Sequence, residues 1–195
     1  MVGYPGKEIP QRVDRPGTGP GLVIPARLAF IDLETTGANP VRDRITRISV
    51  LEAEGEQVST WSTLVNPQRP IPEFIQRLNG IRNEALVDAP TFSQVATELA
   101  DRLHGRLFVA HHARFNYGFV KNEYRRLGKS FRAEGLCTVR LSRKLFPEHQ
   151  NHNLDNLIVR HGLTTGDRHR ALANVDLLWQ FWCLLKRERG DEALA

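Results

Sequence analysis

The segment Leu28–Gly37 constrains the fold of this chain more than any other part of the sequence. It begins with the apolar residues Leu28-Ala-Phe-Ile, which are typical of a buried strand, and it continues with Asp32-Leu-Glu34-Thr-Thr-Gly37. Residues two apart on a strand point to the same face, so Asp32 and Glu34 lie side by side at the end of that strand. Two like charges there repel one another and are costly to desolvate. The pair is therefore either half of a divalent-metal site or two solvated charges at a strand end.

Composition indicates one globular domain with a basic surface. The chain has 195 residues, of which 41% are hydrophobic and 25% charged, and its formal net charge is +5. This length allows a sizeable core, and a basic balance favours a polyanionic partner such as nucleic acid. Without a membrane-length apolar run or a secretory signal, we expect no membrane partner and a cytoplasmic protein. Cys137 and Cys183 are expected to be reduced thiols in the core.

The order of predicted elements indicates an α/β fold. A Pro/Gly-rich lead-in over residues 1–25 precedes the domain, which we place at 26–189, and residues 190–195 form a tail. The first strands are joined by tight turns and are expected to be antiparallel, and strands and helices then alternate. The predicted strands are 27–33, 44–54, 57–65, 106–110 and 136–139. The predicted helices are 72–78, 92–103, 115–127, one that ends at 146, 154–161 and 169–189.

Five segments of the chain together resemble one enzyme family. They are Asp32-Leu-Glu34-Thr-Thr-Gly37, Leu78-Asn-Gly-Ile81, Val109-Ala-His-His-Ala-Arg-Phe-Asn116, Asn153-Leu-Asp-Asn-Leu157 and His169-Arg-Ala-Leu-Ala-Asn174. In this order they resemble the DEDDh 3'–5' exonucleases, a family that includes the proofreading exonuclease subunit of bacterial DNA polymerase III. The resemblance covers about residues 27–187, which is nearly all of the chain after the lead-in.

The resemblance implies a ribonuclease-H-like fold, with a mixed five-stranded sheet and helices on both faces. It also implies phosphodiester hydrolysis with two divalent cations, Mg²⁺ or Mn²⁺, which carboxylate oxygens hold. In the family pattern Asp32 would bridge both cations, Glu34 would hold one, and His169 would take the proton from the attacking water. The expected substrate is the 3' end of single-stranded DNA, RNA remains open, and a polymerase or repair protein is a candidate partner.

The chain departs from the family at two of its four acidic positions. Asn116 stands where the second motif has aspartate, and Asn174 stands where the third motif has it. The formal charge of the site falls from −4 to −2, so we expect the second cation to bind weakly and hydrolysis to be strongly reduced. Asp176 would point away on a helix, and Glu123 lies about 10 Å along the helix axis from Asn116. Asp167 is the one replacement ligand that this geometry leaves open.

Four residues near these motifs are candidate contacts to the terminal nucleotide. Thr35 and Thr36 offer hydroxyl and backbone N–H groups, Phe115 could pack on the terminal sugar or base, and Leu78 could wedge beside the last base. For Phe115 and Leu78, plain core packing is an equally good interpretation. Two basic runs, within 125–132 and 140–144, are either solvated helix faces or a track for phosphates.

Two other functions stay open at this point. One is a catalytically silent domain that binds single-stranded nucleic acid, which differs from the enzyme only in turnover. The other is a protein-interaction module that docks on a polymerase or repair enzyme. Such a module would not bind an oligonucleotide in a salt-dependent way, so a binding titration distinguishes it from the other two.

Overall fold

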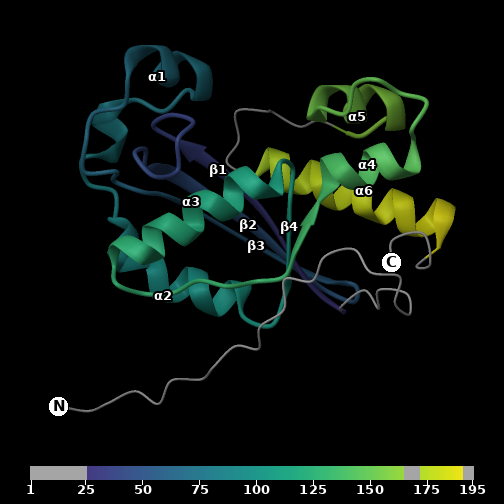
Figure 1. The fold of residues 1–195 in the computed structure, drawn as a ribbon, viewed down its shortest axis with the longest axis horizontal. Coiled ribbons are helices and arrows are strands. Elements are labelled where there is room, and N and C mark those ends of the chain that lie inside the picture. The colour runs from purple at the N-terminus through teal and green to yellow at the C-terminus, as the bar shows by residue number, and fades with distance from the viewer. Residues whose placement is uncertain (1–25, 165–171, 191–195) are drawn as a thin grey trace.

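The computed structural model describes residues 26–164 and 172–190, which form one mixed sheet with helices on both faces (Figure 1). The strands are β1 (Arg27–Thr35), β2 (Ile45–Glu54), β3 (Gln57–Leu64), β4 (Leu107–Ala110) and β5 (Gly135–Cys137). The α-helices are α1 (Glu73–Asn79), α2 (Phe92–Leu103), α3 (Ala113–Arg126), α4 (Thr138–Leu145), α5 (Leu154–His161) and α6 (Ala173–Arg189). A short 3₁₀ helix, η1 (Asn83–Leu86), lies between α1 and α2.

The sheet confirms the predicted mixture of antiparallel and parallel strands. Its order is β3-β2-β1-β4-β5. The first three strands pair antiparallel along the chain, whereas β4 and β5 run parallel to β1. The carboxyl ends of β1, β4 and β5 therefore lie at the same end of the sheet, and ligands of open α/β sheets bind at that end.

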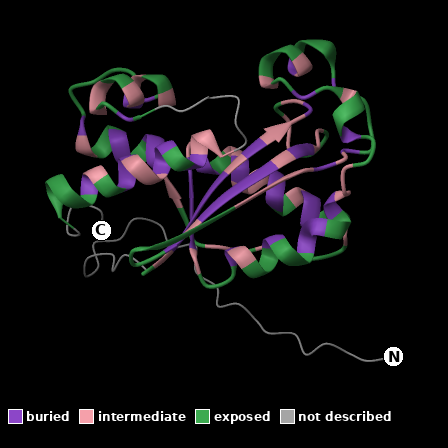
Figure 2. Ribbon diagram, turned by 180° about the vertical axis from the view of Figure 1, so that it is seen from behind, coloured by how far each residue is buried: buried purple, intermediate pink, exposed green. Residues whose placement is uncertain are grey.

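The two faces of β1 belong to two separate hydrophobic cores. Its odd-numbered apolar residues pack with α2 and α3, and its even-numbered ones, Leu28 and Phe30, pack with α4, α5 and α6. Figure 2 shows the central strands buried between these helix layers. Side chains alternate along a strand, so Asp32 and Glu34 continue the even-numbered series and lie on the face that α6 covers.

Element boundaries are confirmed at both ends for two helices whose sequences carry strong end signals. α2 and α5 begin and end at the predicted residues. The backbone N–H of Thr91 donates to the side chain of Gln94 at 2.8 Å before α2, and Gly162 ends α5 with a φ of 59°. The prediction missed η1, because four residues show no helical periodicity.

Other boundaries were wrong by a few residues. α3 begins at Ala113, two residues before its predicted start, after His112 in a left-handed conformation. β5 ends at Cys137 because Thr138 already begins α4. The predicted start of the last helix at His169 lies outside the described residues, and the described helix begins at Ala173.

The expectation that both cysteines lie in the core was wrong for one of them. Cys183 is exposed because it lies on the outer side of α6, next to the buried Trp182, whereas Cys137 is half-buried; both are free thiols. No helix in the described ranges is long and apolar enough to cross a membrane. The predicted lead-in over residues 1–25 and residues 191–195 of the predicted tail lie outside the described residues.

Candidate active site

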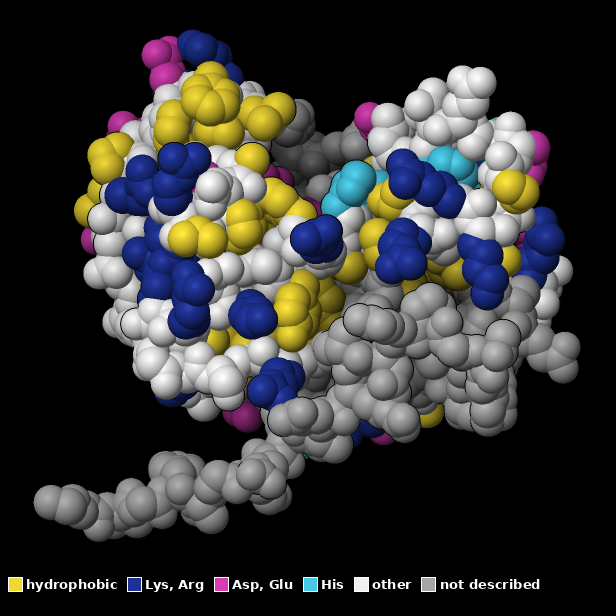
Figure 3. All heavy atoms as spheres, in the orientation of Figure 1, with side chains coloured by type: hydrophobic (Ala, Val, Ile, Leu, Met, Phe, Trp, Pro, Cys, Tyr) yellow, Lys and Arg dark blue, Asp and Glu magenta, His cyan; other side chains and the backbone are white. Residues whose placement is uncertain are grey.

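Asp32 and Asn174 meet where the end of β1 faces the first turn of α6. Nδ2 of Asn174 donates a hydrogen bond to Oδ2 of Asp32 at 2.9 Å. The helix is held on this face of the sheet by Trp179, whose ring lies edge-on to Phe30 with the centroids 5.6 Å apart. On the side of the molecule where β1 and β4 end, the surface is notched between α1 and the pair α4 and α5 (Figure 3). The structure therefore brings the first and third motifs into direct contact.

The two carboxylates on β1 are poorly solvated. Burial raises the pKa of Asp32 above its ordinary value, against the opposing effects of the Asn174 hydrogen bond, the backbone N–H of Leu33 and the charge of Arg47. Burial and the neighbouring charge of Asp32 raise the pKa of Glu34 to about 7, and the charge of Arg47 again opposes the shift. The surrounding protein thus only partly compensates these charges, so the pair attracts a cation.

Asn116 lies at the start of α3, directly after β4. Its side chain is 3% exposed, and Nδ2 donates to the backbone carbonyl of His111 at 2.9 Å. Its Oδ1 is buried and finds no hydrogen-bond donor among the described residues. An unpaired buried carboxamide oxygen is costly, and a cation or a water molecule would satisfy it.

These donors fit a divalent cation in part. In the described ranges, no three His, Cys, Asp or Glu side chains gather into a group that could hold a metal ion. The candidate oxygen donors are the two carboxylates of Asp32 and Glu34 and the neutral amide oxygens of Asn116 and Asn174. Of the two amides, Asn174 contacts Asp32, and it does so through its Nδ2. Hard oxygen donors of this kind suit Mg²⁺ or Mn²⁺, but two of them carry no charge to balance a second dication.

The predicted base His169 and the alternative ligand Asp167 both lie outside the described residues. Two other histidines, His111 and His112, lie within the second motif. Nδ1 of His111 lies 2.9 Å from the hydroxyl of Thr138, and burial and the neighbouring His112 lower the pKa of His111 to about 4. His111 is therefore neutral near pH 7 and bonded within the fold, whereas His112 is exposed.

The four predicted substrate contacts differ in how accessible they are. The Thr35 hydroxyl donates to the carbonyl of Gly37 at 2.6 Å, and Thr36 is buried, with its hydroxyl accepting from the backbone N–H of Arg44 at 3.0 Å. Phe115 is half-buried against Phe119, with ring centroids 4.8 Å apart. Leu78 is 80% exposed at the end of α1, so it does not pack in the core. Of the four, Leu78 is the side chain most available to a ligand.

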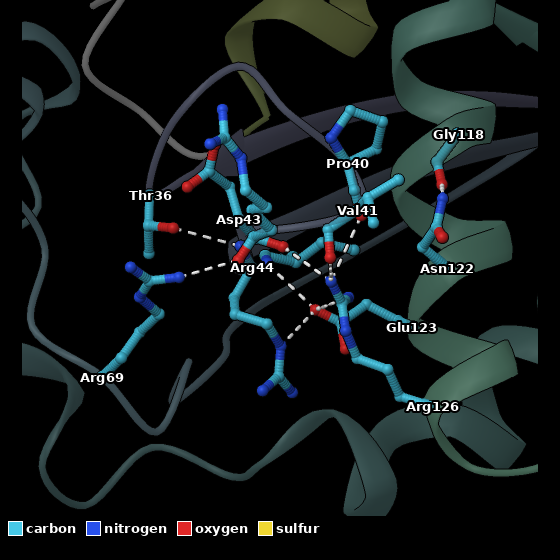
Figure 4. Close-up of polar contacts among 12 residues, drawn as sticks. Thr36, Pro40, Val41, Asp43, Arg44, Arg69, Gly118, Asn122, Glu123 and Arg126 are labelled. Atoms are coloured by element: carbon cyan, nitrogen blue, oxygen red, sulfur yellow. Dashed lines mark hydrogen bonds and ion pairs between the residues drawn. The ribbon is translucent and has the colours of Figure 1, made fainter.

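A buried ion-pair cluster, which the sequence reasoning missed, anchors the chain that follows the carboxylates. Glu123 on α3 is 1% exposed, and its Oε1 accepts from the Arg44 side chain at 2.8 Å and from the backbone N–H of Ile45 at 3.3 Å (Figure 4). Arg126 lies 3.3 Å from the same oxygen. The Glu123 carboxylate is thus paired with Arg44 and Arg126, so it does not replace the missing metal ligands.

Arg126 also clamps the loop between β1 and β2. Its Nη2 donates to the backbone carbonyls of Pro40, Val41 and Asp43 at 3.2, 2.7 and 3.1 Å (Figure 4). Arg126 belongs to the first predicted basic run and is exposed, and these bonds give it a structural role in holding the loop. In the sequence, the adjacent charges of Asp43 and Arg44 are the only indication of this ion-pair cluster.

The same loop is tightly packed at its second residue, Gly37. A Cβ on Gly37 would lie 2.5 Å from Oδ2 of Asp43, and this oxygen accepts from the backbone N–H of Asn39 at 2.8 Å. A Cβ at position 37 would force the Asp43 side chain to move away from Asn39, which favours glycine at the end of Thr-Thr-Gly37. The loop is therefore held at both of its ends, directly beside Asp32 and Glu34.

A family model described as an exonuclease, RNase T, matches residues 29–177 of the chain. Among curated proteins, a PolC-type DNA polymerase III from Caldanaerobacter subterraneus subsp. tengcongensis is 34% identical over 150 residues, which are 76% of this chain and 11% of that protein. The 3'-5' exonuclease DinG from Bacillus subtilis is 36% identical over 154 residues, which are 77% of this chain and 16% of that protein. The chain thus spans less than a fifth of the length of these relatives.

Solved structures of low sequence identity share the fold. Exonuclease X, solved with 5' overhanging duplex DNA, superposes with a TM-score of 0.69 at 23% identity and covers 84% of this chain and 93% of that chain. E. coli Exonuclease I, solved with a dA16 oligonucleotide, gives a TM-score of 0.74 at 16% identity and covers 86% of this chain and 42% of that chain. These matches agree with the predicted ribonuclease-H-like architecture.

Proposed function

The chain belongs to the RNase T family of exonucleases, and from this membership we propose that it is a 3'–5' exonuclease domain for DNA whose hydrolytic rate is strongly reduced. The observation that carries this proposal is the hydrogen bond from Asn174 to Asp32. It directs an N–H group at the carboxylate that should hold the cations. A donor in that position competes with a cation for the same oxygen lone pairs.

We assign the remaining roles in the site by the same reasoning. Divalent cations in such a site generate the nucleophilic hydroxide and neutralise charge on the leaving 3' oxygen. Asp32 and Glu34 are the charged ligands, and Asn116 and Asn174 offer only neutral oxygens. His169 is proposed to accept the proton of the attacking water, because a histidine titrates near neutral pH. Mg²⁺ and Mn²⁺ suit these oxygen donors, and the second ion is expected to bind weakly.

For the substrate we propose a single-stranded DNA 3' end. Support comes from two structures of the same fold that were solved with an overhanging DNA duplex and with an oligonucleotide, and from the net charge of +5. Leu78 and Phe115 are proposed to contact the terminal nucleotide, and Thr35 to hold it through its backbone N–H group. Thr36 is less suited to this role than the sequence implied, because its backbone N–H already donates to the carbonyl of Arg44 at 2.9 Å. A polymerase or repair protein is the proposed macromolecular partner, supported by the polymerase name of one relative. We propose a cytoplasmic location, which the two free cysteines support.

A nuclease assay with a restored variant tests this proposal. A single-stranded DNA labelled at its 5' end is incubated with Mn²⁺ or Mg²⁺ and either the present chain or Asn116→Asp/Asn174→Asp. We expect the restored variant to shorten the strand stepwise from its 3' end at least about 100-fold faster, because two charged ligands return to the site. His169→Ala in the restored background should abolish that gain.

The other outcomes separate the alternatives. Equal rates for the present and the restored chain would show that the two asparagines do not limit hydrolysis. Salt-dependent binding without cleavage by either protein would identify a silent nucleic-acid-binding domain. If neither protein bound an oligonucleotide at all, a protein-interaction module would be the better description. An RNA strand of the same sequence, assayed in parallel, determines the preference between DNA and RNA.

A further inference from the structure

Arg47 lies directly opposite Glu34 in the antiparallel pairing of β1 and β2. Residues that face one another across two antiparallel strands project their side chains from the same face of the sheet. The guanidinium of Arg47 therefore shares a face with both Glu34 and Asp32. It is half-buried, and among the described residues it forms no hydrogen bond or ion pair. The strand register thus places a permanent positive charge on the face of the two carboxylates, and in the described structure Arg47 forms no ion pair with either of them.

A second arginine–glutamate pair lies at the other end of the same two strands and forms an ion pair. Arg27 lies opposite Glu54 in the same register, and there the two side chains close into an ion pair of 3.0 Å. No such contact forms between Arg47 and Glu34 in the described structure. The Arg47 charge nevertheless acts on both site carboxylates, since it lowers the pKa of each. Arg47 is close enough to influence the site and remains available to another anion.

The charges of the site are consistent with one divalent cation. Two carboxylates at −1 each and one guanidinium at +1 leave the described charged groups at a formal charge of −1. One dication would bring this value to +1, which one phosphodiester would neutralise. Two dications would leave it at +3, and the neutral side chains of Asn116 and Asn174 cannot reduce that excess.

We propose that Arg47 is a resident cation of this site, which limits the pocket to one divalent cation and binds the terminal phosphodiester of a nucleic acid 3' end. The inference deepens the proposed function and rests on it. A guanidinium suits this role because it stays charged at all working pH values and presents a fork of N–H donors that matches two phosphate oxygens.

A calorimetric titration with Mn²⁺ alone tests the first half of this proposal. We expect the present chain to bind one Mn²⁺ per molecule. Arg47→Gln should bind Mn²⁺ on the order of tenfold more tightly, because a positive charge next to the dication is removed. Arg27→Gln is the matched control, since it removes an arginine from the same two strands at the end away from the site, and its Mn²⁺ binding should equal that of the present chain.

Oligonucleotide binding in EDTA tests the second half. The present chain should bind a single-stranded DNA without divalent cations, and Arg47→Gln should bind it about tenfold more weakly. A DNA whose last linkage is an uncharged methylphosphonate should lose a similar factor with the present chain and nothing further with Arg47→Gln. That pattern assigns the contact to the terminal phosphate rather than to charge in general, and Arg47→Lys should recover part of the loss.

Neither measurement depends on hydrolysis, so the result stands apart from that of the nuclease assay. Two Mn²⁺ ions of similar affinity in the present chain, or unchanged Mn²⁺ binding in Arg47→Gln, would overturn the limit to one cation. An equal methylphosphonate penalty in both proteins would overturn the phosphate contact. A failure of the restored variant to cleave DNA, with both Arg47 effects present, would refute the proposed catalysis alone.

Discussion

The carboxamide of Asn174 donates its hydrogen bond to the carboxylate of Asp32 across 142 residues of sequence, at 2.9 Å. An aspartate at position 174 could not make this bond in its charged form, because both of its oxygens would only accept. This hydrogen bond therefore offsets, without a cation, part of the burial that raises the pKa of Asp32. A pocket of four carboxylates has no such donor and needs cations to offset the repulsion between its charges.

Asn174→Asp should consequently destabilise the metal-free protein and make it depend on metal. The change replaces a donor by a like charge beside Asp32, so we expect a loss of about 1–3 kcal/mol of unfolding free energy in EDTA. Mn²⁺ should recover more stability in this variant than in the present chain. Urea denaturation with and without Mn²⁺ measures both effects. Asp176→Asn, which alters an exposed residue of the same helix, is the control, and equal stability of Asn174→Asp and the present chain in EDTA would contradict the argument.

Glu123→Gln should destabilise the fold through the loop beside the site. It removes the buried charge that pairs with Arg44 and Arg126, and because these two arginines are partly exposed we expect a loss of about 1–2 kcal/mol. Chemical denaturation measures the loss. Glu73→Gln serves as the comparison, because its ion pair with Arg77 is exposed and should contribute less than about 0.5 kcal/mol. Similar losses in both variants would show that the cluster has no special structural role.

The stability of the metal-free protein should fall as the pH rises from 4.5 to about 7. Over this range the unfolded chain has already released the proton of Glu34, while the folded chain, with its raised pKa, still holds it. Each increase in pH therefore favours unfolding, by on the order of 1–2 kcal/mol in total after allowance for solvent screening.

Glu34→Gln should reduce this pH dependence, and Asp32 should leave a slope of the same sign because its pKa is also raised. Urea denaturation in EDTA across the range measures the slope. A stability that rises with pH over the same range in the present chain would mean that the carboxylate pair is better compensated than its burial indicates.

Leu78→Ala should affect binding rather than folding. The side chain is 80% exposed, so its removal should change the unfolding free energy by less than about 0.5 kcal/mol. If Leu78 contacts the last base, the affinity for single-stranded DNA should fall severalfold. Ile75→Ala, three residues earlier on α1 and 9% exposed, should show the opposite pattern, with a stability loss of about 2 kcal/mol or more. Unchanged oligonucleotide affinity in Leu78→Ala would remove this residue from the proposed substrate contacts.

Much of the architecture could be predicted because it depends on short-range patterns. Thr91 caps the start of α2 and Gly162 ends α5, and the bounds of both helices were predicted correctly to the residue. The placement of Asp32 and Glu34 on one face follows from the two-residue period of a strand. By contrast, the burial of Cys183 was predicted wrongly, because apolar neighbours in sequence do not reveal which side of a helix meets the core.

The sequence by itself determined the identity of the chemical groups: two carboxylates on one strand face, and asparagines where the family has aspartates. Tertiary structure alone decided which groups meet. The contact of Asn174 with Asp32, the position of Arg47 opposite Glu34 and the burial of Glu123 against Arg44 depend on strand register and on helix packing. The contacts of Asn174 with Asp32 and of Glu123 with Arg44 join residues far apart in the chain, so no local pattern specifies them. They form when helices pack on the two faces of β1, whereas the position of Arg47 follows from the register of β1 and β2.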